Sequence, residues 1–194
     1  KEVEKAAEAF ALSEQWFEGV EDDQYKALLY NHFGLLMKSE ENFVGALHYL
    51  KKTYHYELKG DSAYYAMLTC SSIANVYELL GGLDSAKSYF EKGLQCKDRI
   101  SSSRYFIYVK DYANFFRKNG EYEKAEQMLL ECEQHIADER RYSLYSSLAT
   151  LYYEMKAYGR ALVYAEKVIE SEDSVVVRGG LLNLYRIHRQ LGHV

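Results

Sequence analysis

The sequence contains no proline, where a chain of 194 residues would carry roughly ten at average usage. Because proline interrupts helices, its absence predicts long, uninterrupted helices. Long apolar runs are missing as well: stretches such as Val175–Val177 fall far short of the roughly 18 residues that cross a bilayer. We therefore expect no membrane-spanning segment in this sequence.

Cysteine is also scarce, and the 29 acidic residues outnumber the 24 lysines and arginines. Cys70, Cys96 and Cys132 form an odd set without paired spacing, which favours small apolar side chains in packed helices over a disulfide framework. A net charge of −5 argues against direct nucleic-acid contact, since phosphate binding needs a basic surface. Hydrophobic residues make up 48% of the chain, which is enough for a continuous core.

The sequence lacks the motifs that carry catalysis. It has no glycine-rich phosphate loop, no His-Glu-x-x-His zinc helix and no Gly-x-Ser-x-Gly elbow. Among the scattered histidines, only His48 and His55 share a helical face, and seven residues separate them, too far for an i, i+4 metal pair. We expect a non-enzymatic chain without cofactor or metal.

Alanine recurs in the same setting after successive turns, at Ala46, Ala86, Ala125 and Ala161, with spacings of 40, 39 and 36 residues. Such periods are typical of stacked two-helix units, each of which covers its apolar face by packing on its neighbours. Apolar residues recur at i, i+3, i+4 and i+7 around these alanines, which predicts amphipathic helices. The sequence therefore predicts an all-α array of antiparallel helix pairs, with about 36–40 residues per unit.

We predict that a single array spans residues 1–194. Its parts are the second helix of a truncated repeat at 1–20, repeats at 24–60, 61–101, 102–138 and 139–173, and the first helix of a further, truncated repeat at 174–194. Neither end supplies a polar capping helix, so we interpret the sequence as a segment of a longer protein. The uncapped ends leave self-association open.

Small residues occur where the paired helices should approach most closely, at Gly34, Ala74, Ala113 and Ala149. A larger side chain there would cost on the order of 1–3 kcal/mol by overpacking. Glycine or asparagine in turns such as Gly81-Gly82 and Asn119-Gly120 can end a helix in the left-handed conformation, and further turns are expected at Ser39–Glu41 and Lys156-Ala157.

The pattern of aromatic, large apolar and small residues resembles the tetratricopeptide repeat. The fourth unit carries it most fully, at Tyr145, Leu148, Ala149, Tyr152, Tyr158 and Ala161. The resemblance extends over nearly the whole chain and implies a right-handed superhelical solenoid whose first helices line a concave groove. The family's proline at the end of the second helix is missing, and most units have 39 or 40 residues rather than 34.

The resemblance implies that the groove binds a protein or peptide. Residues one step from the core face of the first helices should line it, and the candidates are Asn31, Lys38, Asn75, Lys110, Asn114, Arg117, Thr150, Arg186 and Arg189. An asparagine amide can donate to and accept from a peptide backbone, and the basic residues favour an acidic partner. The plain alternative is a solvated polar helix face.

The carboxylate clamp of the family's chaperone-binding members is not reproduced. Lys110 and Asn114 match its first half, but Ser147 and Gly179 stand where an asparagine and a lysine are wanted. The long, tyrosine-rich units and the segment Gly60–Tyr64 are similar to the sensor regions of bacterial regulators, notably of the Bacteroidetes, which implies the periplasmic side of a membrane. A cytoplasmic scaffold or peptide-sensing regulator, and an accessory domain of an enzyme, remain open.

Overall fold

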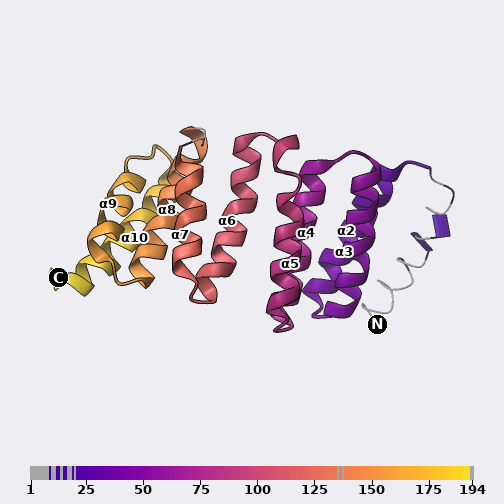
Figure 1. The fold of residues 1–194 in the computed structure, drawn as a ribbon, viewed down its shortest axis with the longest axis horizontal. Helices are drawn as coiled ribbons and strands as arrows, with labels where there is room; N and C mark the ends of the chain where they lie inside the picture. The colour runs from indigo at the N-terminus through magenta and orange to yellow at the C-terminus, as the bar shows by residue number, and fades with distance from the viewer. Residues whose placement is uncertain are drawn as a thin grey trace. The chain divides into compact units, whose positions relative to one another are not determined.

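The computed structural model of the chain describes residues 21–134, 136 and 138–192, together with positions 9, 12, 13, 15, 16 and 19. These residues form α-helices and one 3-10 helix, with no strand among them, which confirms the predicted all-α class (Figure 1). None of the described helices is both long and apolar enough to cross a bilayer. The helix expected at residues 1–20 lies largely outside the described positions.

The first of two compact units extends to Ile100. Its helices run antiparallel in pairs, α2 with α3 and α4 with α5, and α3 also packs against α4, so that the pairs are stacked (Figure 1). Their bounds are α2 Asp23–Ser39, α3 Phe43–Lys59, α4 Ala63–Leu79, α5 Leu83–Leu94 and the 3-10 helix η1 Lys97–Arg99.

The second unit begins at Ser101. Here α6 pairs with α7 and α8 with α9, α7 packs on α8, and α8 also contacts α6 and α10. The bounds are α6 Ser102–Lys118, α7 Tyr122–Glu133, α8 Asp138–Glu154, α9 Tyr158–Ile169 and α10 Ser174–Leu191. The repeat boundaries and the assembly of all repeats into one array stay predictions.

Side chains from the turns fix the start of several helices. Asp22 Oδ1 accepts the backbone N–H of Gln24 at 2.8 Å, and Asn42 Oδ1 accepts that of Gly45 at 3.0 Å. At the start of α10, Asp173 Oδ1 accepts the N–H of Val175 at 2.8 Å. Each cap satisfies a donor that has no partner within its own helix, so these helices begin where the sequence places Asp or Asn.

Helices α2, α3, α4, α6 and α8 end in the same hydrogen-bonded turn. One residue adopts the left-handed conformation, and the next N–H returns to a carbonyl five residues earlier, as from Gly82 to Tyr77 at 2.8 Å and from Ala157 to Tyr152 at 2.9 Å. Glycine holds the left-handed position after α4 and α6, at Gly81 and Gly120. Glu41, Asp61 and Lys156, with φ of 58°, 54° and 60°, hold it after α2, α3 and α8. The backbone is therefore strained wherever a residue other than glycine holds this position, because its Cβ lies too close to the following carbonyl oxygen.

We expect Lys156→Gly to raise the free energy of unfolding by about 1 kcal/mol, because glycine adopts positive φ without steric cost. Urea denaturation followed by circular dichroism measures the change. Gly81→Ala is the matched control: an added Cβ would have no atom within 4 Å, so its expected loss of about 1 kcal/mol reports backbone conformation alone. A Lys156→Gly variant that is no more stable than the wild type contradicts this account.

Small side chains lie at the points of closest helix approach. Ala46, Ala86, Ala125 and Ala161 have no exposed surface. A Cβ built on Gly34 of α2 would lie only 2.7 Å from Leu50 Cγ of α3, which confirms the close approach predicted there. Larger residues would separate these helices.

Tyrosines fill much of the remaining space between helices. Tyr30 stacks on Tyr49 and Tyr56 at centroid distances of 6.1 and 5.6 Å, and Tyr152 stacks on Tyr164 at 5.6 Å. The Tyr152 hydroxyl donates to Glu126 Oε1 at 2.7 Å. Aromatic rings that pack along one side and keep a polar end suit this role.

All three cysteines are buried and free of disulfides. Burial raises the pKa of the Cys70 thiol to about 12. A thiol of that pKa is protonated at neutral pH and behaves as a small apolar side chain.

Candidate functional site

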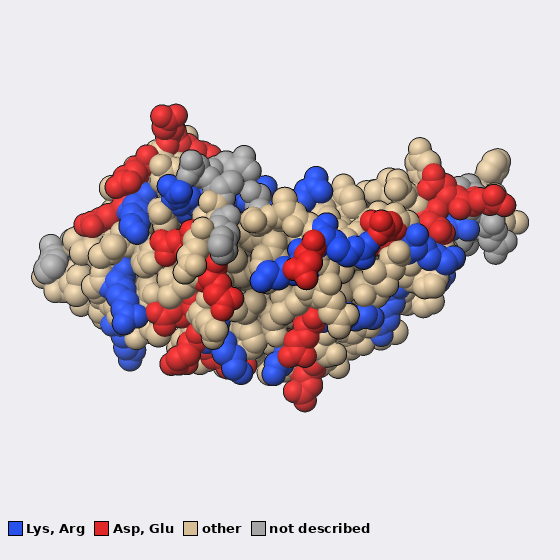
Figure 2. Space-filling view, turned by 45° about the horizontal axis from the view of Figure 1, so that its top comes forward, with Lys and Arg blue, Asp and Glu red and all other residues tan. Residues whose placement is uncertain are grey.

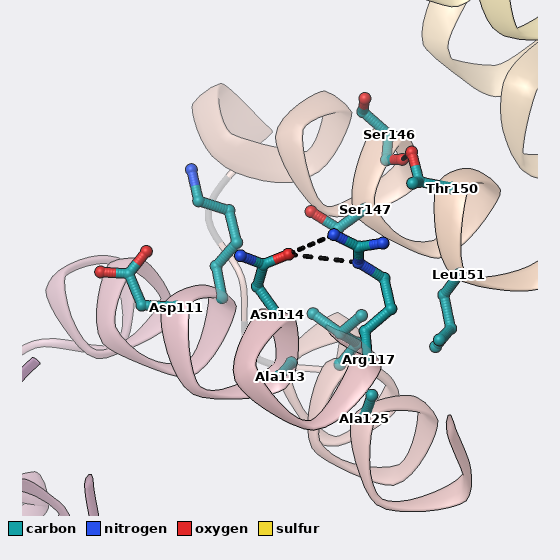
Figure 3. A pocket seen from close by; sticks show the side chains of 11 residues that line it. Asp111, Ala113, Asn114, Arg117, Ala125, Ser146, Ser147, Thr150 and Leu151 are labelled. Atoms are coloured by element: carbon teal, nitrogen blue, oxygen red, sulfur yellow. Dashed lines mark hydrogen bonds between the residues drawn. The ribbon is translucent and has the colours of Figure 1, made fainter. Parts of the chain in front are cut away.

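Helices α6, α7 and α8 of the second unit line an open cavity of about 250 Å³. Lys110, Asn114 and Arg117 follow one another at i, i+4 and i+7, which places them on one face of α6. Thr150 comes from α8, so four of the predicted groove residues meet in this cavity (Figure 3). The other lining residues are Asp111, Ala113, Ala125, Leu129, Ser146, Ser147 and Leu151.

Arg117 is held in place by polar groups from two helices. Asn114 Oδ1 accepts from its Nε at 3.1 Å and from its Nη2 at 2.7 Å, as the dashed lines in Figure 3 show. Its Nη1 forms an ion pair with Glu154 of α8. The guanidinium therefore bridges α6 and α8, and the amide oxygen of Asn114 is already used. The amide nitrogen of Asn114, turned away from the guanidinium, can donate to a ligand.

The charge of this cavity is balanced. Glu154 compensates Arg117, and Asp111 lines the same wall as Lys110. Figure 2 likewise shows Asp and Glu interspersed with Lys and Arg over the face in view. An acidic partner, predicted from the basic residues in the sequence, stays a prediction.

The other predicted groove residues lie elsewhere. Arg186 and Arg189 are exposed on α10 and do not line the α6–α8 cavity. In the first unit, Asn31 lines a second cavity with residues of α2, α3 and α4, whereas the half-buried Lys38 and Asn75 line neither cavity. The candidate residues are thus divided between separate places, and their role in binding stays a prediction.

Sequence reasoning missed Glu57, a carboxyl that lines the cavity of the first unit and is 7% exposed. A signal was present, because Ala46, Leu50, Thr53 and Glu57 follow one another at i, i+4, i+7 and i+11, and all four are buried. The buried face of α3 therefore includes two polar residues, Thr53 and Glu57. A polar residue on a buried helix face indicates a candidate functional site.

The α6–α8 cavity offers groups for binding. The Ser147 hydroxyl donates to the carbonyl of Ser143 at 3.0 Å, and that of Thr150 donates to the carbonyl of Ser146 at 2.9 Å, so neither is paired with a base. Across the described part of the chain, no group of three His, Cys, Asp or Glu could hold a metal ion. The Lys110 ammonium and the Asn114 amide nitrogen remain as donors, beside the buried apolar residues of the lining, and this combination suits a polar chain such as a peptide backbone.

Residues 143–171, which contain most of α8 and all of α9, match the family model of the tetratricopeptide repeat. This segment is similar to a tetratricopeptide repeat. It supplies the α8 wall of the cavity, including Ser146, Ser147 and Thr150. No curated protein sequence matches the chain.

Solved structures share the fold over most of the chain. BtubC (BKLC) from P. vanneervenii has a TM-score of 0.77 at 19% identity, covering 98% of this chain and 83% of its own. The pilF protein of Pseudomonas aeruginosa has a TM-score of 0.68 at 19% identity, covering 88% and 71%. The MamA protein has a TM-score of 0.57 at 17% identity, covering 86% and 83%. At these identities the likeness concerns the fold alone, which is built of paired helices.

Proposed function

We propose that this chain is a non-catalytic protein-interaction module that binds a peptide segment in the α6–α8 cavity. The observation that carries the proposal is the cavity wall itself, where Lys110 and Asn114 of α6 face Thr150 of the next helix pair. The match of residues 143–171 to the tetratricopeptide repeat supports it, because helical repeats use the surface along successive helices to bind extended partners.

A peptide library displayed on phage and selected on the wild-type protein tests this proposal. We expect selected peptides to bind Lys110→Ala and Asn114→Ala variants roughly three- to tenfold more weakly, the effect of losing one hydrogen bond of about 1 kcal/mol. Fluorescence anisotropy of labelled peptides measures the dissociation constants.

Gln127→Ala provides the control. Gln127 is exposed on α7, donates to Glu131 Oε1 at 3.1 Å and does not line the α6–α8 cavity. We expect its variant to bind the peptides as the wild type does. Selected peptides that bind all three variants equally would place binding away from this cavity and would contradict the proposal.

More specifically, we propose that this chain is the sensor segment of a larger bacterial regulatory protein and lies on the periplasmic side of its membrane. Long proline-free units and the segment Gly60–Tyr64 support it through their resemblance to such sensors. The full-length gene product tests it. A signal sequence and a membrane span are expected, whereas an amino-terminal helix-turn-helix would favour a cytoplasmic peptide receptor, and a catalytic domain would favour an enzyme's accessory module.

A further inference from the structure

The cavity of the first unit has a volume of about 530 Å³, within the range typical of small-ligand sites. Residues of α2, α3 and α4, with two from the turns that precede α2 and α4, enclose it. They are Asp22, Gln24, Tyr25, Ala27, Leu28, Asn31, Glu57, Ser62 and Tyr65. The cavity shares no residue with the α6–α8 cavity.

Glu57 is the unusual member of this set. It is more than nine-tenths buried, and its Oε2 has no hydrogen-bond partner among the described residues. The Thr69 hydroxyl of α4 hydrogen-bonds the same carboxyl. A buried acceptor without a donor costs free energy, and a ligand that supplies the donor recovers that cost.

The lining of the cavity selects for a cation. Among the described residues that line it, two are carboxyls, Asp22 and Glu57, and none is a lysine or arginine, so this lining repels an anionic ligand. The rings of Tyr25 and Tyr65 are each more than half exposed and can hold a cation over their faces. Leu28 adds exposed apolar surface for an alkyl stem.

The single open oxygen favours an ammonium over a guanidinium. A guanidinium binds a carboxylate through two parallel hydrogen bonds and needs both oxygens, whereas an ammonium is a compact charge that one oxygen can meet. Thr69 already engages the Glu57 carboxyl. We propose that this cavity binds an alkylammonium group of the kind that a lysine side chain carries, with Glu57 as its counter-ion and Tyr25 and Tyr65 beside its stem.

The ionisation of Glu57 makes this binding depend on pH. Burial raises its pKa to about 7, and the hydrogen bond from Thr69 opposes that rise. The titratable groups that face it are Asp22 and Tyr25 from the α2 side, and Tyr65 and Cys70 from α4.

The raised pKa of Glu57 sets the direction in which the stability of the protein and its affinity for an ammonium change with pH. The folded state favours the protonated carboxyl, so the stability that Glu57 contributes is present below its unfolded pKa of 4.5 and is lost as pH rises through about 7. An ammonium pairs with the ionised carboxylate. Its affinity therefore increases over the range in which the stability of the free protein falls.

Titration of pentylamine into the ¹⁵N-labelled protein tests the proposal, with the side-chain amide of Asn31 as the reporter at the cavity wall. Pentylamine, like lysine with its pKa near 10.4, stays charged at neutral pH. We expect saturable shifts of the Asn31 amide at about pH 8, and an affinity at least about tenfold weaker at about pH 5.5, where Glu57 is protonated. Neutral 1-pentanol, the matched alcohol, should give no saturable shift.

Two variants separate the site from general charge effects. Glu57→Gln keeps the shape of the side chain and should weaken pentylamine binding at least about tenfold. Glu91→Gln removes an exposed carboxylate from α5 and should leave binding unchanged. If Glu57→Gln does not fold, the pH series and the pentanol comparison on the wild type decide the question.

Equal affinity at the two pH values, equal binding of pentanol, or unchanged binding by a folded Glu57→Gln variant would each overturn the proposal. The peptide acetyl-Gly-Lys-Gly-amide then identifies the source of the ammonium. Binding at least as tight as that of pentylamine indicates a lysine of a protein partner, and binding of pentylamine alone indicates a free amine. Either result supports the ammonium site, and neither depends on the α6–α8 cavity.

Discussion

We expect Leu50→Ala to lower the free energy of unfolding by about 2–5 kcal/mol, the cost of removing a large side chain from a packed core. Leu50 has no exposed surface and lies in one buried cluster with Ala46, Ile73 and Val76. It belongs to α3, whereas Ile73 and Val76 belong to α4. The loss therefore falls on the contact between successive helix pairs, on which a repeat array depends, and also on the contact of Leu50 with α2 inside its own pair.

Leu58→Ala is the matched control for this prediction. Leu58 lies on the same helix and is 44% exposed. Its truncation should cost less than about 1 kcal/mol, since surface substitutions have small effects. Urea denaturation of both variants, followed by circular dichroism, measures the difference. Equal losses at positions 50 and 58 would mean that the α3–α4 contact does not stabilise the fold as described.

We expect Gly34→Ala to lower the free energy of unfolding by about 1–3 kcal/mol, although alanine is the better helix former by about 1 kcal/mol. The new Cβ would lie 2.7 and 2.8 Å from Leu50 Cγ and Cδ2, and 3.3 Å from the backbone nitrogen of Leu50. Leu50 is fully buried, so shifting its side chain away from the new Cβ would disturb the close-packed core around it.

Gly179→Ala provides the control of opposite sign for Gly34→Ala. Gly179 lies within α10, and an added Cβ would have no atom within 4 Å. Only the helix propensity changes there, so we expect a gain of up to about 1 kcal/mol. Thermal and urea denaturation compare the two variants. If Gly34→Ala gains stability as Gly179→Ala does, α2 and α3 can accommodate a larger residue at position 34, and the close approach described here does not limit their packing.

The fold class could be predicted because it rests on local patterns. The period of the alanines follows from the packing of one helix pair on the next, and Ala46, Ala86, Ala125 and Ala161 are all fully buried. The left-handed residues were only partly predictable. Glycine at positions 81 and 120 indicates the left-handed conformation in the sequence itself. At Glu41 and Lys156, by contrast, the hydrogen bonds of the turn impose a conformation that the side chain does not favour.

The candidate site was harder to predict because it depends on contacts between helices. Spacing along α6 places Lys110, Asn114 and Arg117 on one face, but the ion pair of Arg117 with Glu154 depends on how α6 and α8 align. Glu154 thus neutralises the positive charge of Arg117, which from the sequence alone was expected to be available to an acidic partner. The cavity at Glu57 likewise forms only where α2, α3 and α4 meet, which no single helix specifies.

The most direct test of the packing of small against large residues is a double-mutant cycle between Gly34 and Leu50. Truncation of Leu50 creates the space that the Cβ of Gly34→Ala needs, because these two groups would otherwise lie 2.7 Å apart. We predict that the double variant loses less stability than the two single losses added together, by about 1–2 kcal/mol. Additive losses, within about 0.5 kcal/mol, would contradict the claim that a small residue at position 34 is what lets α2 and α3 pack together.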